Sequence, residues 1–126
     1  MTWEAEAIPD PDHVYRRAHR VHLDADGTFK PSIFKDIGGS VSTNWEKYCA
    51  TAEECRAKAK EPPKNGVLKG NAGSVRGIPD LAVTHTPVQE TEPVPDRSHT
   101  CVLGPKPEAV RLKLHEIFEI VLLPIT

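Results

Sequence analysis

The chain has 126 residues, enough for one domain with a modest core and too few for two independent domains. Its 16 Lys and Arg residues nearly balance 18 Asp and Glu residues, and a formal net charge of -2 does not favour non-specific binding to nucleic acid. Hydrophobic residues make up 38% and aromatic residues 6%, so the core must consist mainly of aliphatic side chains.

The cysteines and the apolar segments indicate where in the cell the protein is expected to be. Cys49, Cys55 and Cys101 form no Cys-x-x-Cys pair, and the acidic residues 1–6 lack the basic region of a signal peptide. The longest apolar stretch, residues 117–125, is interrupted by an acid and a proline and is shorter than the ~20 residues of a membrane helix. We therefore expect a cytoplasmic protein with reduced thiols and no membrane association.

Residues 1–12 combine two prolines with acids and alanines, which predicts a flexible leader ahead of a single domain over residues 13–126. In that domain, short β-forming segments and helical patterns are separated by turn residues. The predicted elements are a strand over 14–23, a helical turn over 32–35, a strand over 40–42, a helix over 51–60, an irregular glycine-rich run over 67–75, a strand over 81–85, an exposed loop over 86–98, a strand over 99–103 and a helix over 107–121.

Two helices carry start signals. Thr51 and Glu54 form a capping box before a segment whose apolar face contains only small residues. Pro107 fits the first turn of the C-terminal helix, in which apolar residues recur at helical spacing through Val121. We expect the C-terminal helix to be the main contributor to the core, so that Phe118→Ala costs much more stability than removal of the Cys55 thiol.

These elements predict an α+β fold: a single small domain with a mixed or mainly antiparallel sheet and a C-terminal amphipathic helix packed on one face.

Residues that carry chemistry concentrate between positions 14 and 45, on short segments divided by turns, as in the polar pockets of compact scaffolds. Two histidines on later strands that we expect to be neighbours form a candidate imidazole pair. The candidate ligand- or partner-binding residues are Arg16, His19, Ser32, Phe34, Lys35, Asp36, Ser42, His85 and His99. The four expected to converge on one concavity are Arg16, His19, Lys35 and His99.

Metal and cofactor signatures are incomplete. His19 and His22 precede Asp24 and Asp26, residue types that bind zinc or iron, but residues three apart on a strand face opposite sides. Aligned as a calcium loop, the same turn places Ile33 where a bidentate glutamate is needed. The glycine-rich segments lack phosphate-loop endings. The sequence therefore assigns no metal and no cofactor.

Four short motifs occur in order along the chain. They are Tyr15-Arg16-x-x-His19, Ser32-x-Phe34-Lys35-Asp36, Ser40-Val41 and Ser98-His99-Thr100. With them the chain resembles a widespread family of small uncharacterised bacterial proteins, which share a Tyr-Arg-x-x-His start, a serine segment ending in Phe-Lys/Arg, a Ser-Val strand and a Pro-x-His segment. The resemblance covers most of residues 14–121, although Ser98 departs from the shared pattern. It implies a bacterial single-domain protein and names no activity.

A rich polar surface without a complete catalytic set predicts a non-enzymatic accessory or protein-interaction module of a bacterial multi-gene system. Its expected partner is a protein from the same operon, bound through residues 16–36. The alternative is a small nucleotide- or NAD-directed enzyme or ligand sensor, in which Arg16 holds a phosphate while His19 and His99 serve as acid, base or orienting groups. ADP-ribosyl-transferring folds offer a distant parallel, but the predicted strand over 99–103 lacks their catalytic glutamate.

Overall fold

The computed structural model describes residues 3–35, 39–89 and 95–126. Within these residues, six strands form one sheet in the order β4-β5-β2-β1-β3-β6, and every neighbouring pair is antiparallel. The strands are β1 (His13–His19), β2 (Ser40–Trp45), β3 (Asn65–Asn71), β4 (Ala82–His85), β5 (His99–Leu103) and β6 (Glu119–Leu122).

The helices of the described residues are short. The α-helices are α1 (Ala52–Ala57), α2 (Ala72–Arg76) and α3 (Glu108–Ile117), and the 3-10 helices are η1 (Arg20–His22), η2 (Pro31–Phe34) and η3 (Pro62–Lys64). The predicted α+β class, a single domain with an antiparallel sheet and a C-terminal helix, is confirmed. None of the helices formed by residues 3–35, 39–89 and 95–126 is long and apolar enough to cross a bilayer.

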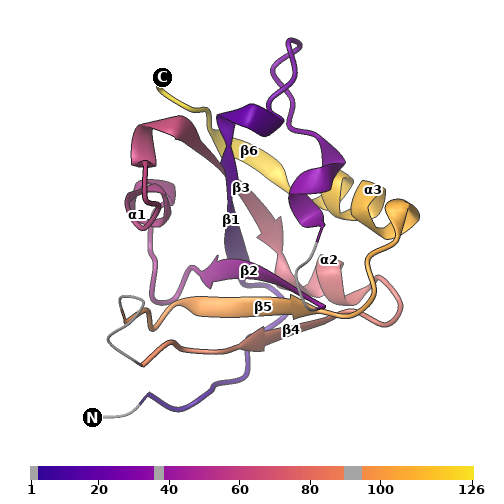
Figure 1. Ribbon diagram of the computed structural model, residues 1–126. Helices are drawn as coiled ribbons and strands as arrows, with labels where there is room; N and C mark the ends of the chain where they lie inside the picture. The colour runs from indigo at the N-terminus through magenta and orange to yellow at the C-terminus, as the bar shows by residue number, and fades with distance from the viewer. Residues whose placement is uncertain (1–2, 36–38, 90–94) are drawn as a thin grey trace.

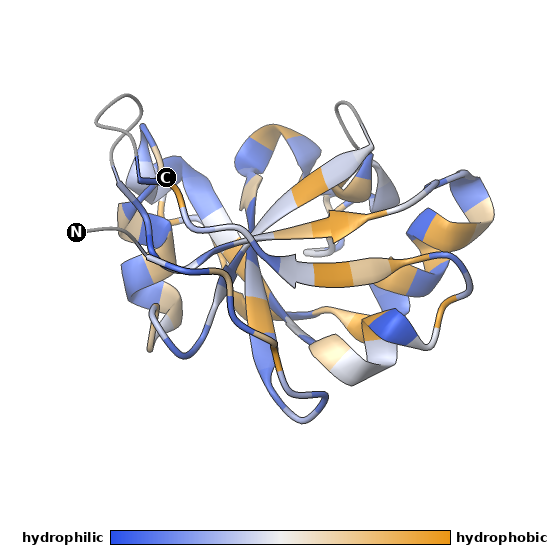
Figure 2. Cartoon of the chain, turned by 90° about the horizontal axis from the view of Figure 1, so that it is seen from below, coloured by the Kyte–Doolittle hydropathy of each residue, from blue (hydrophilic) through white to orange (hydrophobic). Residues whose placement is uncertain are grey.

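Helices cover both faces of the sheet formed by β1, β3 and β6, with α1 on one side and α2 and α3 on the other (Figure 1). We call these the α1 face and the α3 face. Side chains alternate between the faces of a strand, so Val14 enters the large core on the α3 face while Tyr15 enters a smaller cluster under α1. The hydropathy of the strands changes from residue to residue accordingly (Figure 2).

The sheet divides where β1 meets β2. These strands pair at only two positions, Val14 with Trp45 and Tyr15 with Asn44. Beyond them β1 follows β3 while β2 follows β5, and the two halves run in clearly different directions (Figure 1). The backbone of β2 before Asn44 therefore has no ladder partner on β1, and a side chain must satisfy it.

The C-terminal helix is shorter than predicted. It ends at Ile117, and the following residues alternate as in a strand: Phe118 and Ile120 pack on the core, whereas Glu119 and Val121 are exposed. These residues pair with β3 as β6. The predicted helix over 107–121 is therefore wrong beyond Ile117, because the edge of β3 supplies backbone partners that compete with the last helical turn.

The glycine-rich run over 67–75 is regular, contrary to the sequence prediction. Its first part is β3, which pairs residue by residue with the whole of β1, and its second part is α2. Asn71 caps α2, since its side-chain oxygen accepts from the backbone N–H of Ser74 at 2.8 Å. A close approach occurs at Gly70, where an added Cβ would lie 2.7 Å from the ring of Phe118. A register shift against β6 falls between Val67 and Leu68.

Residues 3–12, expected to be an unpacked leader, lie against the sheet. Ile8 is 3% exposed and belongs to the main core. The backbone N–H of Glu6 donates to Nδ1 of His85 at 3.0 Å, and Asp12 accepts from the indole nitrogen of Trp45 at 2.9 Å. Composition alone does not reveal this packing, because it depends on one apolar residue finding a distant partner.

The start of α1 follows its sequence signal. The hydroxyl of Thr51 accepts from the backbone N–H of Glu54 at 3.2 Å, and the Glu54 carboxylate accepts from the backbone N–H of Ala50 at 3.0 Å. The helix ends at Ala57, three residues earlier than predicted. Its inward side places Cys55 in the cluster of the α1 face, where the thiol is fully buried.

Candidate functional site

The register of the sheet separates the predicted site residues. His99 lies opposite Asn44, and Asn44 lies opposite Tyr15, so these three side chains share the α1 face. Arg16 follows Tyr15 on β1 and points to the α3 face. The expected convergence of Arg16 and His99 is therefore wrong, because an odd offset along a strand sends a side chain to the other side of the sheet.

His19 does not join Arg16 either. Three residues further along β1, it lies on the α1 face, where its Nδ1 accepts from the backbone N–H of Val21 at 3.1 Å and thereby caps η1. Its Nε2 lies 3.8 Å from a carboxylate oxygen of Glu61. The structure therefore gives this imidazole a local structural role.

The predicted imidazole pair is also separated. His85 lies opposite Thr100, on the α3 face, whereas His99 lies on the α1 face. His85 is 3% exposed, its ring meets Trp45 edge-on with 5.1 Å between centroids, and its Nε2 lies 2.6 Å from the carbonyl oxygen of Arg97. Its two ring nitrogens are thus occupied by backbone groups, which excludes a pair with His99.

The serine and phenylalanine of η2 have different surroundings. Ser32 is exposed, whereas Phe34 is 1% exposed and packs on Phe118 with 5.0 Å between ring centroids. Phe34 is therefore a core residue and not a ligand contact. Asp36 lies outside the described residues.

One depression does contain predicted site residues. It has a volume of about 170 Å³, and we call it the Arg16 cleft; its lining residues are Arg16, Lys35, Ser40, Val41 and Ser42.

Arg16 crosses the division between β1 and β2. Its Nε and Nη2 both donate to the carbonyl oxygen of Ile33, at 3.1 and 2.7 Å, and its Nη1 donates to the carbonyl oxygen of Ser42 at 3.0 Å. A guanidinium group has five N–H bonds, so two remain for a ligand. The hydroxyl of Ser40 is buried and has no hydrogen-bond partner in the described structure. The donors that Arg16 leaves unused are therefore the ones the cleft can offer to a ligand.

The cleft carries positive charge from Arg16 and Lys35. Burial, followed by repulsion from Arg17, lowers the pKa of Arg16 from 12.5 to about 10, because both disfavour the charged guanidinium. Among the described residues, no Asp or Glu forms an ion pair with Arg16 or Lys35. An anion in the cleft would offset the cost of this buried charge.

A larger depression, of about 360 Å³, lies elsewhere on the sheet and was not anticipated from the sequence. Its lining residues are His13, Lys69, Asn71, Ile117 and Glu119. They contribute both signs of charge, and two of them also contact Glu46, at 3.2 Å from His13 and 3.9 Å from Lys69. Such internal compensation leaves this depression without the clear ligand preference of the Arg16 cleft.

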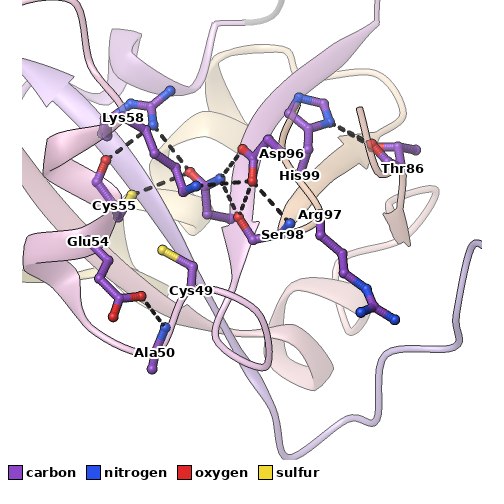
Figure 3. Close-up of polar contacts among 12 residues, drawn as sticks. Cys49, Ala50, Glu54, Cys55, Lys58, Thr86, Asp96, Arg97, Ser98 and His99 are labelled. Atoms are coloured by element: carbon purple, nitrogen blue, oxygen red, sulfur yellow. Dashed lines mark hydrogen bonds and ion pairs between the residues drawn. The ribbon is translucent and has the colours of Figure 1, made fainter. Parts of the chain in front are cut away.

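On the α1 face, Ser42 and His99 are diagonal neighbours on β2 and β5, with 3.3 Å between Oγ and Nε2. The other ring nitrogen, Nδ1, lies 3.0 Å from the carbonyl oxygen and 2.9 Å from the hydroxyl of Thr86 (Figure 3). When Nδ1 donates to this carbonyl oxygen, which can only accept, Nε2 accepts from the Ser42 hydroxyl. The sequence named both residues but gave no reason to pair them.

A polar network next to this pair holds the segment before β5 in place. Asn44 donates from Nδ2 to Asp96 at 2.8 Å and to the hydroxyl of Ser98 at 2.9 Å, and Lys58 lies 3.3 Å from Asp96 (Figure 3). Burial opposes ionisation of Asp96, but hydrogen bonding from Ser98 and the charge of Lys58 outweigh it, so the pKa of Asp96 lies below its ordinary 3.8. The sequence predicted only an exposed loop here, although Ser98 is fully buried.

This network predicts a pH-dependent contribution to stability. Because the folded pKa of Asp96 lies below the unfolded value, its carboxylate stabilises the fold above about pH 4 and loses this contribution as the pH falls through the lower folded value. Asp96→Asn should lower the free energy of unfolding by about 1 kcal/mol at neutral pH, with partial exposure limiting the effect. The difference from wild type should shrink in acid, as urea unfolding at a series of pH values would measure.

The exposed Glu116→Gln is the matched control for this experiment, since it removes a carboxylate outside the network. It should change stability little at any pH. If the loss of unfolding free energy in Asp96→Asn stays constant from neutral pH to strong acid, the role assigned to the carboxylate is contradicted.

Neither a metal site nor a known relative helps to assign a function to these sites. Within residues 3–35, 39–89 and 95–126, no group of three or more His, Cys, Asp or Glu side chains is arranged to hold a metal ion. No family model, curated protein or solved structure matches the chain, so its function is inferred from the Arg16 cleft and the Ser42–His99 pair themselves.

Proposed function

We propose that the chain is a cytoplasmic accessory module that binds an acidic segment of a partner protein at the Arg16 cleft. The observation that carries this proposal is the charge of Arg16, which is disfavoured by burial and which no carboxylate of the described residues neutralises. A partner carboxylate would accept hydrogen bonds from the two remaining guanidinium N–H groups, and the ammonium of Lys35 would add to the attraction.

The size of the cleft favours a single anionic group over a whole nucleotide. Small-molecule sites usually measure about 300–1,000 Å³ and enclose most of the ligand, whereas the Arg16 cleft measures about 170 Å³. A base and a ribose would remain outside it. A protein partner needs no such enclosure, because neighbouring surface contributes the rest of the contact area. As the most direct source of that partner we propose a protein encoded in the same bacterial operon.

Binding of a fluorescein-labelled polyglutamate peptide, followed by fluorescence polarisation, tests this proposal. Lys35→Glu should weaken binding at least about tenfold, equivalent to about 1.4 kcal/mol, because it reverses a charge in the cleft.

Lys113→Glu is the matched control, because Lys113 is exposed on α3 and the change in net charge is the same. Equal loss of binding in Lys35→Glu and Lys113→Glu would show that only the overall charge matters and would overturn the proposal. Tight binding of NAD or ATP, with none of the peptide, would favour the nucleotide-directed alternative. A native-lysate protein retained by Lys113→Glu and lost by Lys35→Glu would identify the partner.

A further inference from the structure

We propose that Ser42 is a reactive serine that accepts an acyl group from an activated acyl donor, with His99 as its base. This inference is independent of the proposed function, since it rests on side chains of the α1 face. It adds a covalent modification site to the module and requires no turnover.

The geometry supplies the parts that activate a serine. A weakly nucleophilic hydroxyl needs a base within hydrogen-bond reach, and the base needs a third group to fix its orientation. Here Oγ of Ser42 lies 3.3 Å from Nε2 of His99, while the carbonyl oxygen of Thr86 holds Nδ1 at 3.0 Å. Donation from Nδ1 to this carbonyl oxygen favours the tautomer in which Nε2 has its lone pair available for the proton of Ser42.

The scaffold holds these groups firmly while leaving the hydroxyl accessible. Ser42 lies on β2 and His99 on β5, which pair over five consecutive positions, and Thr86 directly follows β4. Sites on paired strands are held more precisely than sites on loops. The side chain of Ser42 is exposed, so an acyl donor can reach it from solvent.

Ser42 differs in this respect from the other serines, all of which lie in the described residues. The hydroxyls of Ser74 and Ser98 bond to Asn71 and Asp96, and the hydroxyl of Ser40 is buried without a partner. Ser32, the fifth serine, is exposed on η2 without an imidazole contact. The arrangement around Ser42 is therefore not a general property of serines on this surface.

The step balances with an activated ester as the donor. The Oγ of Ser42 forms a bond to the acyl carbon, and its proton passes to Nε2 of His99. The bond between the acyl carbon and the leaving oxygen breaks, and the leaving group departs with the electron pair. The products are an O-acylated serine and the leaving alcohol, which recovers the proton from His99.

Reaction with p-nitrophenyl acetate, followed by intact-mass and peptide mass spectrometry, tests the inference. We expect one acetyl group on Ser42 and about one equivalent of nitrophenolate. Ser42→Ala should abolish this adduct, and His99→Gln should slow its formation at least about tenfold, because a positioned general base contributes 10²–10⁴-fold. Ser74→Ala should acetylate like the wild type, since Ser74 faces an amide and no imidazole.

Thermal unfolding of each variant must accompany the labelling, so that a loss of reactivity in a misfolded protein is recognised; a fluorophosphonate probe of the folded variants provides a second readout. Equal acetylation of wild type and Ser42→Ala, or an unchanged rate in folded His99→Gln, would overturn the inference. Acetylation confined to lysines would do the same. Because polyglutamate binding is measured separately, either proposal can fail while the other stands.

Discussion

Replacing Phe118 with alanine should lower the free energy of unfolding by about 3 kcal/mol, from lost transfer energy plus the cavity left behind. The Phe118 ring is 4% exposed and packs on Phe34, with 5.0 Å between the ring centroids. Urea unfolding measures the effect. Cys55→Ala is the comparison: it removes one buried sulfur and a contact of 3.4 Å with Asn44, and should cost much less. Equal costs would place the main core on the α1 face.

The contact between Phe118 and Gly70 provides a sharper form of this prediction. An added Cβ on Gly70 would lie 2.7 Å from three atoms of the Phe118 ring, so Gly70→Ala alone should be destabilising. In the Phe118→Ala background the same methyl group enters vacated space. The two substitutions should therefore be non-additive by about 1 kcal/mol or more in the favourable direction. Simple additivity would contradict the proposed packing of the ring on β3.

Gly104→Ala should be destabilising by an amount on the order of 3 kcal/mol, because backbone strain and a steric clash act together. Gly104 follows β5 with a φ of 117°, and an added Cβ would lie 2.2 Å from the carbonyl oxygen of Asp80, a backbone atom that cannot rotate away. Movement of this loop would disturb the alignment of β4 with β5. Chemical denaturation of the variant measures the cost.

Gly27→Ala separates the two causes. Gly27 also has a positive φ, 86°, but an added Cβ there would meet no atom within 4 Å. This control should lose only about 1 kcal/mol, the part due to backbone strain. If Gly104→Ala and Gly27→Ala lose the same free energy of unfolding, the clash with Asp80 contributes nothing. The close contact between Gly104 and Asp80 would then not constrain the fold.

Both candidate sites arise from the way β2 is placed in the sheet. Its backbone edge faces the division from β1, where Arg16 replaces missing ladder hydrogen bonds and brings its charge into the cleft. Its α1-face side chains lie beside β5, where Ser42 meets His99. One strand thus contributes to both candidate sites: the backbone carbonyl of Ser42 accepts from Arg16, and the hydroxyl of Ser42 lies beside His99.

The features that were predictable from the sequence depend on local interactions. The capping box at Thr51 works through atoms within one helical turn, and Pro107 immediately precedes the observed α3. The strand predicted over 99–103 is β5, and the one predicted over 81–85 is β4 with one residue fewer. Secondary-structure propensity and hydrophobic alternation were sufficient for these elements and for the α+β class.

The composition of the sites was decided by tertiary structure. Arg16 and His99 appeared to belong together, but the register that pairs His99 with Asn44 and Asn44 with Tyr15 sends them to opposite faces. Register also brought Ser42 beside His99, although the two residues are 57 positions apart in the chain.

The end of the chain also shows that the sequence alone does not determine every element. An apolar pattern compatible with a longer helix became the strand β6 beyond Ile117, because the edge of β3 was open to it. The sequence by itself determined which segments are helical or extended wherever the controlling contacts lie within a few residues. Only the tertiary structure decided which strand faces which, since pairing between distant segments depends on backbone groups that are the same in every residue and leave no signature in the sequence.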